Sequence, residues 1–136
     1  NRGKILITSS AGGFMPCPKS AAYSGGKAFS YFYGMAMYQE LIELGSNVTI
    51  TVLCPPPTRT GFAKVAGMEH TKTFEKSSKM AKDADFVAKE AYDALMAGKR
   101  LVSPGKFARV LVKIMNPIAR PRKVVSLMKL TEWGAK

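Results

Sequence analysis

The sequence predicts an α/β fold with a parallel sheet. Three short apolar runs, Lys4–Thr8, Val48–Cys54 and Leu101–Val102, have the composition of buried strands. Longer segments with apolar residues at steps of three and four separate these runs, which is the helical period. Strands that alternate with helices in this way favour a parallel sheet joined by right-handed crossovers.

Length and composition agree with one globular domain. The chain has 136 residues, of which 46% are hydrophobic and 22% charged. No apolar stretch approaches the roughly 18 residues that a membrane-spanning helix needs. The chain begins at Asn1, only a few residues before its first apolar run, so we expect it to start inside a fold and to be part of a longer protein.

Histidine and cysteine are too sparse for several kinds of site. Cys17 and Cys54 are far apart, and His70 is the one histidine of the sequence. This pattern argues against a zinc site and against a Ser-His-Asp triad, so no metal is expected. Two free thiols are typical of a reducing compartment, which favours a cytoplasmic protein.

A long helix is expected from Ser20 or Ala21 to about Leu44. Ser20 is a suitable N-cap, and Gly45 suits the left-handed position that follows a helix. The spacing of apolar residues predicts a buried face made of Ala28, Phe29, Phe32, Met35, Ala36 and Leu41.

This helix also contains three glycines, Gly25, Gly26 and Gly34. Each costs about 1 kcal/mol relative to alanine inside a helix, so we expect a neighbouring backbone or a ligand to approach them closely.

The second half of the chain alternates in the same way. Three consecutive prolines end the second strand at 55–57, because proline cannot donate to a sheet. Residues 58–82 are polar and broken by glycine, which predicts loops and a short helix. A second long helix is expected over 84–97, with Asp83 as its cap and Gly98 as its stop.

Two loops should meet at the functional edge of this sheet. Ser9-Ser10 follow the first strand, and the segment Pro55–Thr60 follows the second. In open parallel sheets, ligands bind beyond the carboxyl ends of the strands. The sequence therefore predicts that both loops contribute to a binding site.

Tyr23 and Lys27 are four residues apart on the long helix, and hence on one face. An ammonium one turn away stabilises the phenolate, which suits proton exchange with a carbonyl or alcohol oxygen. Ser10, at the mouth of the first strand, offers a hydroxyl that can donate to or accept from the same oxygen. The alternatives are two surface residues of a helix and a serine that bonds its own turn.

Taken in order, these motifs resemble the short-chain dehydrogenase/reductase (SDR) family. The family has a strand ending in Ser-Ser-x-x-Gly, then Tyr-x-x-x-Lys opening a long helix, then a strand ending in Pro-Gly-x-x-x-Thr. The matching stretches here are 9–13, 23–27 and 55–60. The resemblance covers residues 3–105 and implies that 1–105 form the C-terminal half of a Rossmann-type, doubly wound parallel sheet.

The resemblance implies NAD(P)(H)-dependent interconversion of a small-molecule carbonyl and an alcohol by hydride transfer. Tyr23 would be the general acid and base and would also contact the cofactor. Ser10 would bind the carbonyl oxygen, and Lys27 would hold the ribose of the nicotinamide nucleotide. Thr60 would bond the carboxamide of NADPH or NADH, with NADPH slightly favoured. The backbone at Thr58, together with Pro55, would contact the nicotinamide.

The chain departs from the family pattern in three ways. Pro56 replaces the glycine of the third motif, which removes a backbone donor near the nicotinamide. The glycine-rich phosphate loop and the catalytic asparagine of the family have no counterpart in this sequence. In the family, both belong to an N-terminal half that lies upstream of the position matching Asn1. We therefore expect residues 1–136 alone neither to bind cofactor nor to turn over substrate.

The basic charge is concentrated in an extension over 106–136. Of the formal net charge of +12, the segment Lys99–Lys136 carries +9, from ten Lys and Arg and one Glu. Residues 106–130 mix these bases with apolar residues, and Pro117 and Pro121 divide the segment into two amphipathic pieces. One interpretation is peripheral contact with an anionic membrane, and the other is an arm that packs on the domain or on a partner subunit.

Three further expectations concern function and partners. A non-catalytic binding protein that retains the fold is one alternative to an enzyme. A nucleic-acid binder is another, but no aromatic and basic stacking platform accompanies the charge, so we expect no nucleic acid partner. As a full-length protein of the family, the molecule is expected to be a homo-oligomer. The resemblance implies that the aromatic run 31–33 serves the core or a contact with the second subunit.

Overall fold

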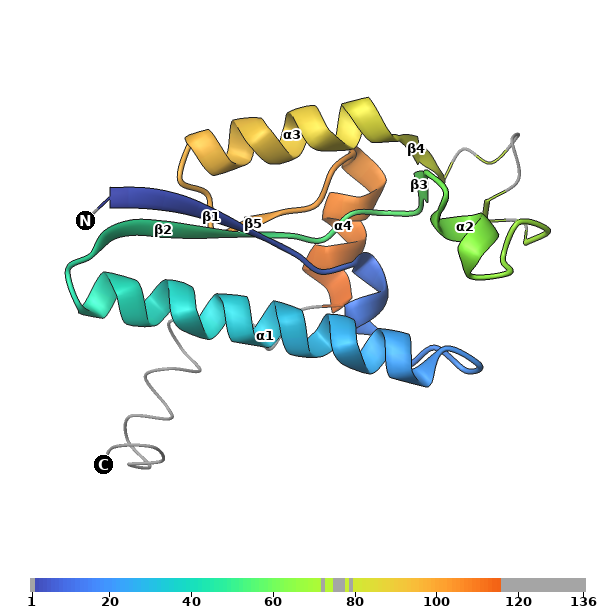
Figure 1. Cartoon of the computed structure of the whole chain (residues 1–136), viewed down its shortest axis with the longest axis horizontal. Helices are drawn as coiled ribbons and strands as arrows, with labels where there is room; N and C mark the ends of the chain where they lie inside the picture. The colour runs from blue at the N-terminus through green and yellow to red at the C-terminus, as the bar shows by residue number, and fades with distance from the viewer. Residues whose placement is uncertain (1, 72, 75–77, 79, 116–136) are drawn as a thin grey trace.

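A computed structural model describes residues 2–71, 73–74, 78 and 80–115 of the chain (Figure 1). The main sheet and its two long helices lie within one or two residues of the positions that the sequence predicts. The elements are β1 (Arg2–Thr8), the 3₁₀ turn η1 (Ala11–Phe14), α1 (Ala21–Glu43), β2 (Asn47–Leu53), β3 (Thr58–Arg59), α2 (Phe62–Val65), β4 (Lys82–Asp83), α3 (Ala84–Met96), β5 (Leu101–Val102) and α4 (Lys106–Met115).

The main sheet has the strand order β1-β2-β5, and both of its pairings are parallel. Thr8 pairs with Leu53, which in turn pairs with Val102, so the three strands end side by side. A separate parallel pair, β3 with β4, stands beyond this edge. The predicted α/β class with a parallel sheet is confirmed.

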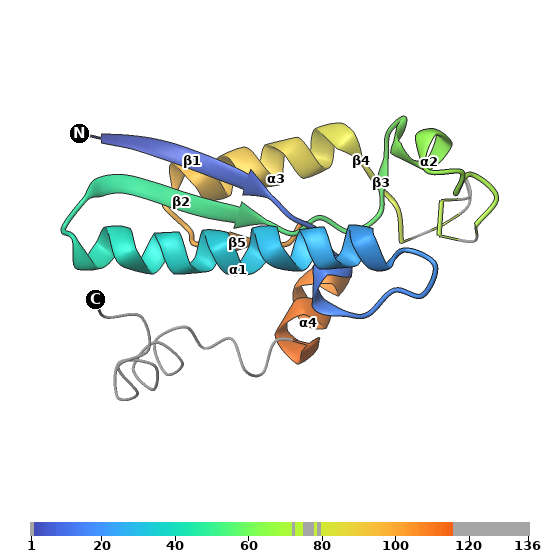
Figure 2. The same ribbon diagram turned by 60° about the horizontal axis from the view of Figure 1, so that its bottom comes forward.

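The two long helices cover opposite faces of the sheet, as Figures 1 and 2 show. Ile50 and Val52 of β2 belong to the core under α1, whereas Leu53 packs with Val87 and Ala91 of α3. This alternation is the period of a strand with both faces buried. The fold is therefore doubly wound, with one helix layer on each side.

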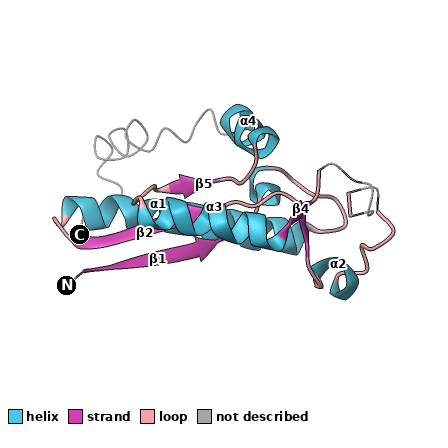
Figure 3. Ribbon diagram, turned by 90° about the horizontal axis from the view of Figure 1, so that it is seen from above, coloured by secondary structure: helices cyan, strands magenta, loops and turns pink. Residues whose placement is uncertain are grey.

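One of the two crossovers differs from the expected hand. The strands step in one direction across the sheet, yet α1 and α3 lie on opposite faces, so the two crossovers have opposite hands. Figure 2, with α1 in front, shows that β1–α1–β2 is right-handed, as expected. The prediction of right-handed crossovers throughout is wrong for β2–α3–β5. That connection first makes the β3–α2–β4 excursion (Figure 3), so the rule for direct crossovers does not constrain it.

The buried face of α1 also differs from the predicted one. Phe29 and Phe32 were expected in the core but are 69% and 63% exposed. Tyr31 is the buried aromatic residue instead, and its ring packs edge-on against Phe14 at 4.7 Å between ring centroids. The sequence pattern failed here because nearly every position of this helix segment is apolar, so spacing alone does not select a face.

Helix ends are confirmed at their glycines but not at their expected caps. Gly45 and Gly98 have φ values of +63° and +65°, the left-handed conformation that ends a helix. The side chains of Ser20 and Asp83 form no capping hydrogen bond. Asp83 instead pairs with Arg59 of β3, 2.9 Å away.

The three glycines of α1 have different surroundings. A Cβ built on Gly34 would lie 2.6 Å from Cγ2 of Val52 and 3.1 Å from Cδ1 of Ile7, so the helix sits directly on the sheet there. Gly34 is closely approached, but by side chains of the sheet and not by the expected backbone or ligand. No backbone approaches Gly25 or Gly26, since no described atom beyond their own stretch of the helix would lie within 4 Å of a Cβ at either position.

We predict opposite effects of alanine at two of these positions. Gly34→Ala should destabilise the fold by about 1–3 kcal/mol, because the new methyl group overpacks the contact with β2. Gly25→Ala should stabilise it by up to about 1 kcal/mol, since alanine favours the helix and meets nothing. Urea denaturation of both variants measures the difference, and equal effects would contradict the packing described here.

The start of the basic extension, which the sequence predicts to be amphipathic, forms the helix α4. In α4, Ala108 and Val112 are buried against the domain, and Arg109 pairs with Glu90 of α3 at 2.6 Å. The rest of the extension, including both of its prolines, lies outside the described residues. Among those that are described, no helix is long and apolar enough to cross a membrane.

Candidate active site

Three segments converge at the carboxyl edge of the sheet. The loop after β1 runs beside the end of β2, where the amide of Ser9 donates to the carbonyl of Leu53 at 2.8 Å. The amide of Ala11 donates to the carbonyl of Pro55 at 3.0 Å. The first turns of α1 face the same edge (Figure 2). The predicted meeting of the two loops is confirmed.

Ser10 and Tyr23 lie on the same side of the molecule, around Gly12. A Cβ built on Gly12 would be 3.5 Å from Oγ of Ser10 and 3.6 Å from Cε1 of Tyr23. Tyr23 is 38% exposed, so its ring is open to solvent at this edge. A serine hydroxyl and a tyrosine ring thus border one small space.

The hydroxyl of Ser10 is oriented by its own turn. Its Oγ accepts a hydrogen bond from the amide of Gly12 at 3.1 Å and so caps η1. The alternative interpretation, that Ser10 bonds its own turn, is therefore confirmed. Because that bond uses only an acceptor position, the hydroxyl proton stays available to donate to a bound oxygen.

Lys27 turns back onto the end of β1. Its Nζ donates to the carbonyl of Thr8 at 3.2 Å and lies 5.8 Å from the centroid of the Tyr23 ring. An ammonium has three donors, and the described residues occupy one of them. The cation is therefore adjacent to the phenol and still able to bind hydroxyl groups.

The backbone of α1 at Lys27 is held against the loop by two contacts that sequence reasoning missed. Ser9 is 2% exposed, and its Oγ donates to the carbonyl of Lys27 at 2.7 Å. A Cβ on Gly13 would lie 2.9–3.0 Å from backbone atoms of Lys27 and Ala28. The sequence signal for these contacts was the pairs Ser9-Ser10 and Gly12-Gly13. Ser9 and Gly13 are the members that hold α1 against the loop.

Cys54 is fully buried beneath this site. Burial raises the pKa of its thiol from an ordinary value of 9.0 to about 12, although hydrogen bonds with Ser9 and Ser10 and the charge of Lys27 oppose the rise. The thiol therefore stays protonated at neutral pH, and a thiol is a poor nucleophile. Cys54 belongs to the buried core cluster that includes Tyr31 and Val52.

This raised pKa predicts a loss of stability at alkaline pH. Above about pH 9 the unfolded chain releases the Cys54 proton while the folded chain retains it until about pH 12. The free energy of unfolding should therefore fall as pH rises through that window. Urea midpoints from pH 8 to 10.5 should fall less steeply for Cys54→Ala than for the wild type, and equal slopes would contradict the burial of this thiol.

The remaining predicted site residues, Pro55, Thr58 and Thr60, lie on the proline-rich segment after β2. The hydroxyl of Thr58 donates to the carbonyl of Pro56 at 2.9 Å, and the hydroxyl of Thr60 accepts from the amide of Phe62 at 3.2 Å. Neither hydroxyl bonds to Ser10, Tyr23 or Lys27 in the described part of the chain. The carbonyl of Pro55 accepts from the amide of Ala11, so the loop after β2 is held by the backbone of the loop after β1.

Phe62, at the start of α2, is a neighbour of Tyr23 that the sequence did not reveal. The two ring centroids are 5.5 Å apart, and Phe62 also lies 6.2 Å from Phe74. Phe62 is 42% exposed. An aromatic surface thus adjoins the phenol, and no spacing rule links positions 23 and 62.

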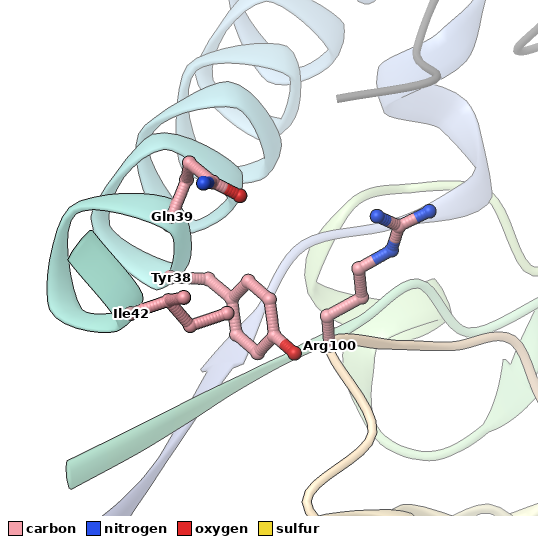
Figure 4. Close-up of a pocket in the computed structure, with 4 residues that line it drawn as sticks. All are labelled: Tyr38, Gln39, Ile42 and Arg100. Carbon is pink, nitrogen blue, oxygen red and sulfur yellow. The ribbon is translucent and has the colours of Figure 1, made fainter. Parts of the chain in front are cut away.

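Surface cavities of the described residues lie elsewhere. One of about 440 Å³ is lined by Tyr38, Gln39, Ile42 and Arg100, near the opposite end of α1 (Figure 4). Another, of about 460 Å³, lies between α3, β5 and α4. The chemistry-bearing residues line neither, and no group of metal-ligating side chains occurs within the described ranges. The candidate site is therefore the edge of the sheet where the functional groups converge.

Comparison with known proteins points to one family. The family model described as short chain dehydrogenase matches residues 1–74. Curated proteins give no significant match. Similar solved structures include a short chain dehydrogenase/reductase from Burkholderia phymatum in complex with NAD, which is 16% identical with a TM-score of 0.63, over 91% of this chain and 49% of that one.

Two further structures agree. A short-chain dehydrogenase from Sphingobium yanoikuyae in complex with NADPH is 18% identical with a TM-score of 0.60, over 94% of this chain and 42% of that one. One from Streptomyces avermitilis is 16% identical with a TM-score of 0.56, over 96% and 52%. At this identity the structures establish the fold alone. The chain spans about half the length of each, which agrees with the expected half of a Rossmann-type domain.

Proposed function

The chain belongs to the short-chain dehydrogenase family, and on that premise we propose that it is the catalytic half of an NAD(P)(H)-dependent oxidoreductase. The reaction interconverts a carbonyl and an alcohol by hydride transfer. Tyr23 acts as general acid in reduction and as general base in oxidation. Ser10 binds the carbonyl oxygen, and Lys27 stabilises the phenolate form and binds the ribose.

One observation carries this proposal: Ser10 and Tyr23 border the same space around Gly12, with Lys27 beside the ring. Two donors that meet one carbonyl oxygen polarise the carbonyl bond. When hydride reaches the carbon, the oxygen takes the proton of Tyr23, and the ammonium of Lys27 offsets the charge left on the phenol.

The residues at this edge fit a nicotinamide nucleotide. Lys27 has donors left for ribose hydroxyls, and Thr60, Thr58 and Pro55 lie on the loop that follows β2. The cofactor supplies the hydride, and the protein supplies position and electrostatics. Pro56 offers no amide, so the chain has one backbone donor fewer for the carboxamide than the family pattern provides.

The test is an assay of cofactor oxidation. The polypeptide encoded by the complete reading frame should oxidise NADPH or NADH in the presence of aldehydes or ketones, with NADPH slightly preferred. Residues 1–136 alone should neither turn over nor bind the cofactor. If no carbonyl compound accelerates cofactor oxidation by the complete polypeptide, the protein is a non-catalytic member of the fold.

We also propose peripheral contact with anionic membranes through residues 106–130. In α4, Val110 and Ile114 are 54% and 69% exposed, and Arg109 and Lys113 are exposed on the same helix. Apolar side chains bordered by bases suit the interface of an anionic bilayer. The chain should sediment with vesicles containing phosphatidylserine more than with phosphatidylcholine alone, and Ile114→Glu should reduce this. Equal sedimentation with both vesicles would refute the proposal.

Self-association through α1 is proposed for the complete protein. Phe29 stacks on Tyr33 at 5.7 Å, and these two side chains and Phe32 are all more than half exposed. Exposed aromatic residues gathered on one helix mark an interaction surface. Sedimentation equilibrium should give a dimer or larger oligomer that Phe32→Glu weakens, and a monomeric wild type would refute the proposal.

A further inference from the structure

We propose that Phe62 selects carbonyl substrates bearing an aromatic or planar apolar group, an inference that rests on the proposed reaction at Tyr23. Phe62 is the residue of α2 whose ring meets the phenol, at 5.5 Å between centroids and 39° between planes. A carbonyl whose oxygen reaches the hydroxyl of Tyr23 therefore places one of its substituents near Phe62.

The position of Phe62 is fixed by the segments around it. Its amide donates to the hydroxyl of Thr60, and the pairing of β3 with β4 closes the base of this excursion. Arg59 strengthens that base by binding Asp83 at 2.9 Å and the carbonyl of Ser78 at 3.1 Å. These contacts hold α2, and with it the ring of Phe62, next to Tyr23.

The neighbours of the phenol differ in chemistry. Oγ of Ser10 and Sγ of Cys17 lie with the Tyr23 ring around Gly12, and both groups are small. The aromatic neighbour of the phenol is Phe62, itself in ring contact with Phe74. This asymmetry orients a substrate with its carbonyl oxygen toward Ser10 and its larger group toward the phenyl ring.

The exposed surface of Phe62 favours an aryl group over a polar one. The ring is 42% exposed beside a phenol that is 38% exposed, so apolar area remains for a ligand to cover. Offset or tilted ring pairs are favourable beyond the area they bury, whereas the hydroxyl groups of a sugar would lose water there without gaining a partner.

The experiment compares benzaldehyde with butanal as substrates of the polypeptide from the complete reading frame. The wild type should show the higher kcat/KM for benzaldehyde. Phe62→Ala should lower the ratio of the two kcat/KM values about ten-fold, and Phe62→Leu, which keeps apolar volume without a ring, should also lower it. Phe62→Tyr should preserve the ratio.

Phe86→Ala is the matched control. Phe86 lies on α3, is likewise 42% exposed, and makes no ring contact with Tyr23, so the ratio should not change. A preference for butanal, or an unchanged ratio in Phe62→Ala and Phe62→Leu, would overturn the inference while leaving the reaction intact. If neither aldehyde nor any other carbonyl is reduced by the wild type, the proposed reaction fails, and this inference fails with it.

Discussion

Tyr23→Phe should reduce kcat by about 10²- to 10⁴-fold, the usual contribution of a positioned general acid. The substitution removes one oxygen atom and leaves the ring that packs against Phe62. Cofactor affinity should therefore stay close to that of the wild type, since Lys27 and the loop after β2 are untouched. Steady-state assays, with cofactor binding followed by fluorescence, separate the two effects.

The chain offers a matched control for this substitution. Tyr33 lies on the same helix, ten residues beyond Tyr23, and is 52% exposed. Tyr33→Phe removes the same hydroxyl and should leave kcat unchanged. Wild-type turnover in Tyr23→Phe would remove this residue from the mechanism, and equal losses in both variants would point to a structural effect.

Gly13→Ala is expected to have the largest effect on the fold near the site. The added methyl group would lie 2.9–3.0 Å from backbone atoms of Lys27 and Ala28, and a helix backbone cannot rotate away as a side chain can. Overpacking of this kind costs about 1–3 kcal/mol. The displaced loop would also carry Ser10 away from Tyr23, so activity should fall together with stability.

Gly12→Ala tests this explanation one residue away. There the methyl group would meet Ser10, Tyr23 and Cys17 at 3.5–4.0 Å, which is ordinary contact. Thermal unfolding should show a clear loss for Gly13→Ala and little change for Gly12→Ala. A similar loss for both would mean that the loop is sensitive to any side chain, and the close approach to α1 would not be the cause.

The fold was predictable where local signals are strong. The apolar runs gave β1, β2 and β5, and Gly45 and Gly98 marked the helix ends because a positive φ is cheap only for glycine. The buried face of α1 was not predictable, because almost every candidate position is apolar. Which aromatic residue meets the sheet depends on tertiary packing, and here Gly34 brings the helix down on the side of Tyr31.

The candidate site also has a part that was predictable from the sequence and a part that was not. Tyr23 and Lys27 are one helical turn apart, so their proximity follows from the sequence. The approach of Ser10 could be inferred only from motif order, because it depends on how β1 and α1 pack. Ser9 and Phe62 were missed, since one acts through the backbone of α1 and the other arrives from a segment whose path no local pattern encodes.

The most direct test of a shared oxyanion pocket is a double-mutant cycle on the polypeptide from the complete reading frame. Two side chains that stabilise one developing charge cannot lose their contributions independently. The variant with both Ser10→Ala and Tyr23→Phe should therefore retain nearly the kcat/KM of the more damaged single variant. Losses that simply multiply would mean that the two hydroxyl groups serve separate places, and the assignment of a common site would be wrong.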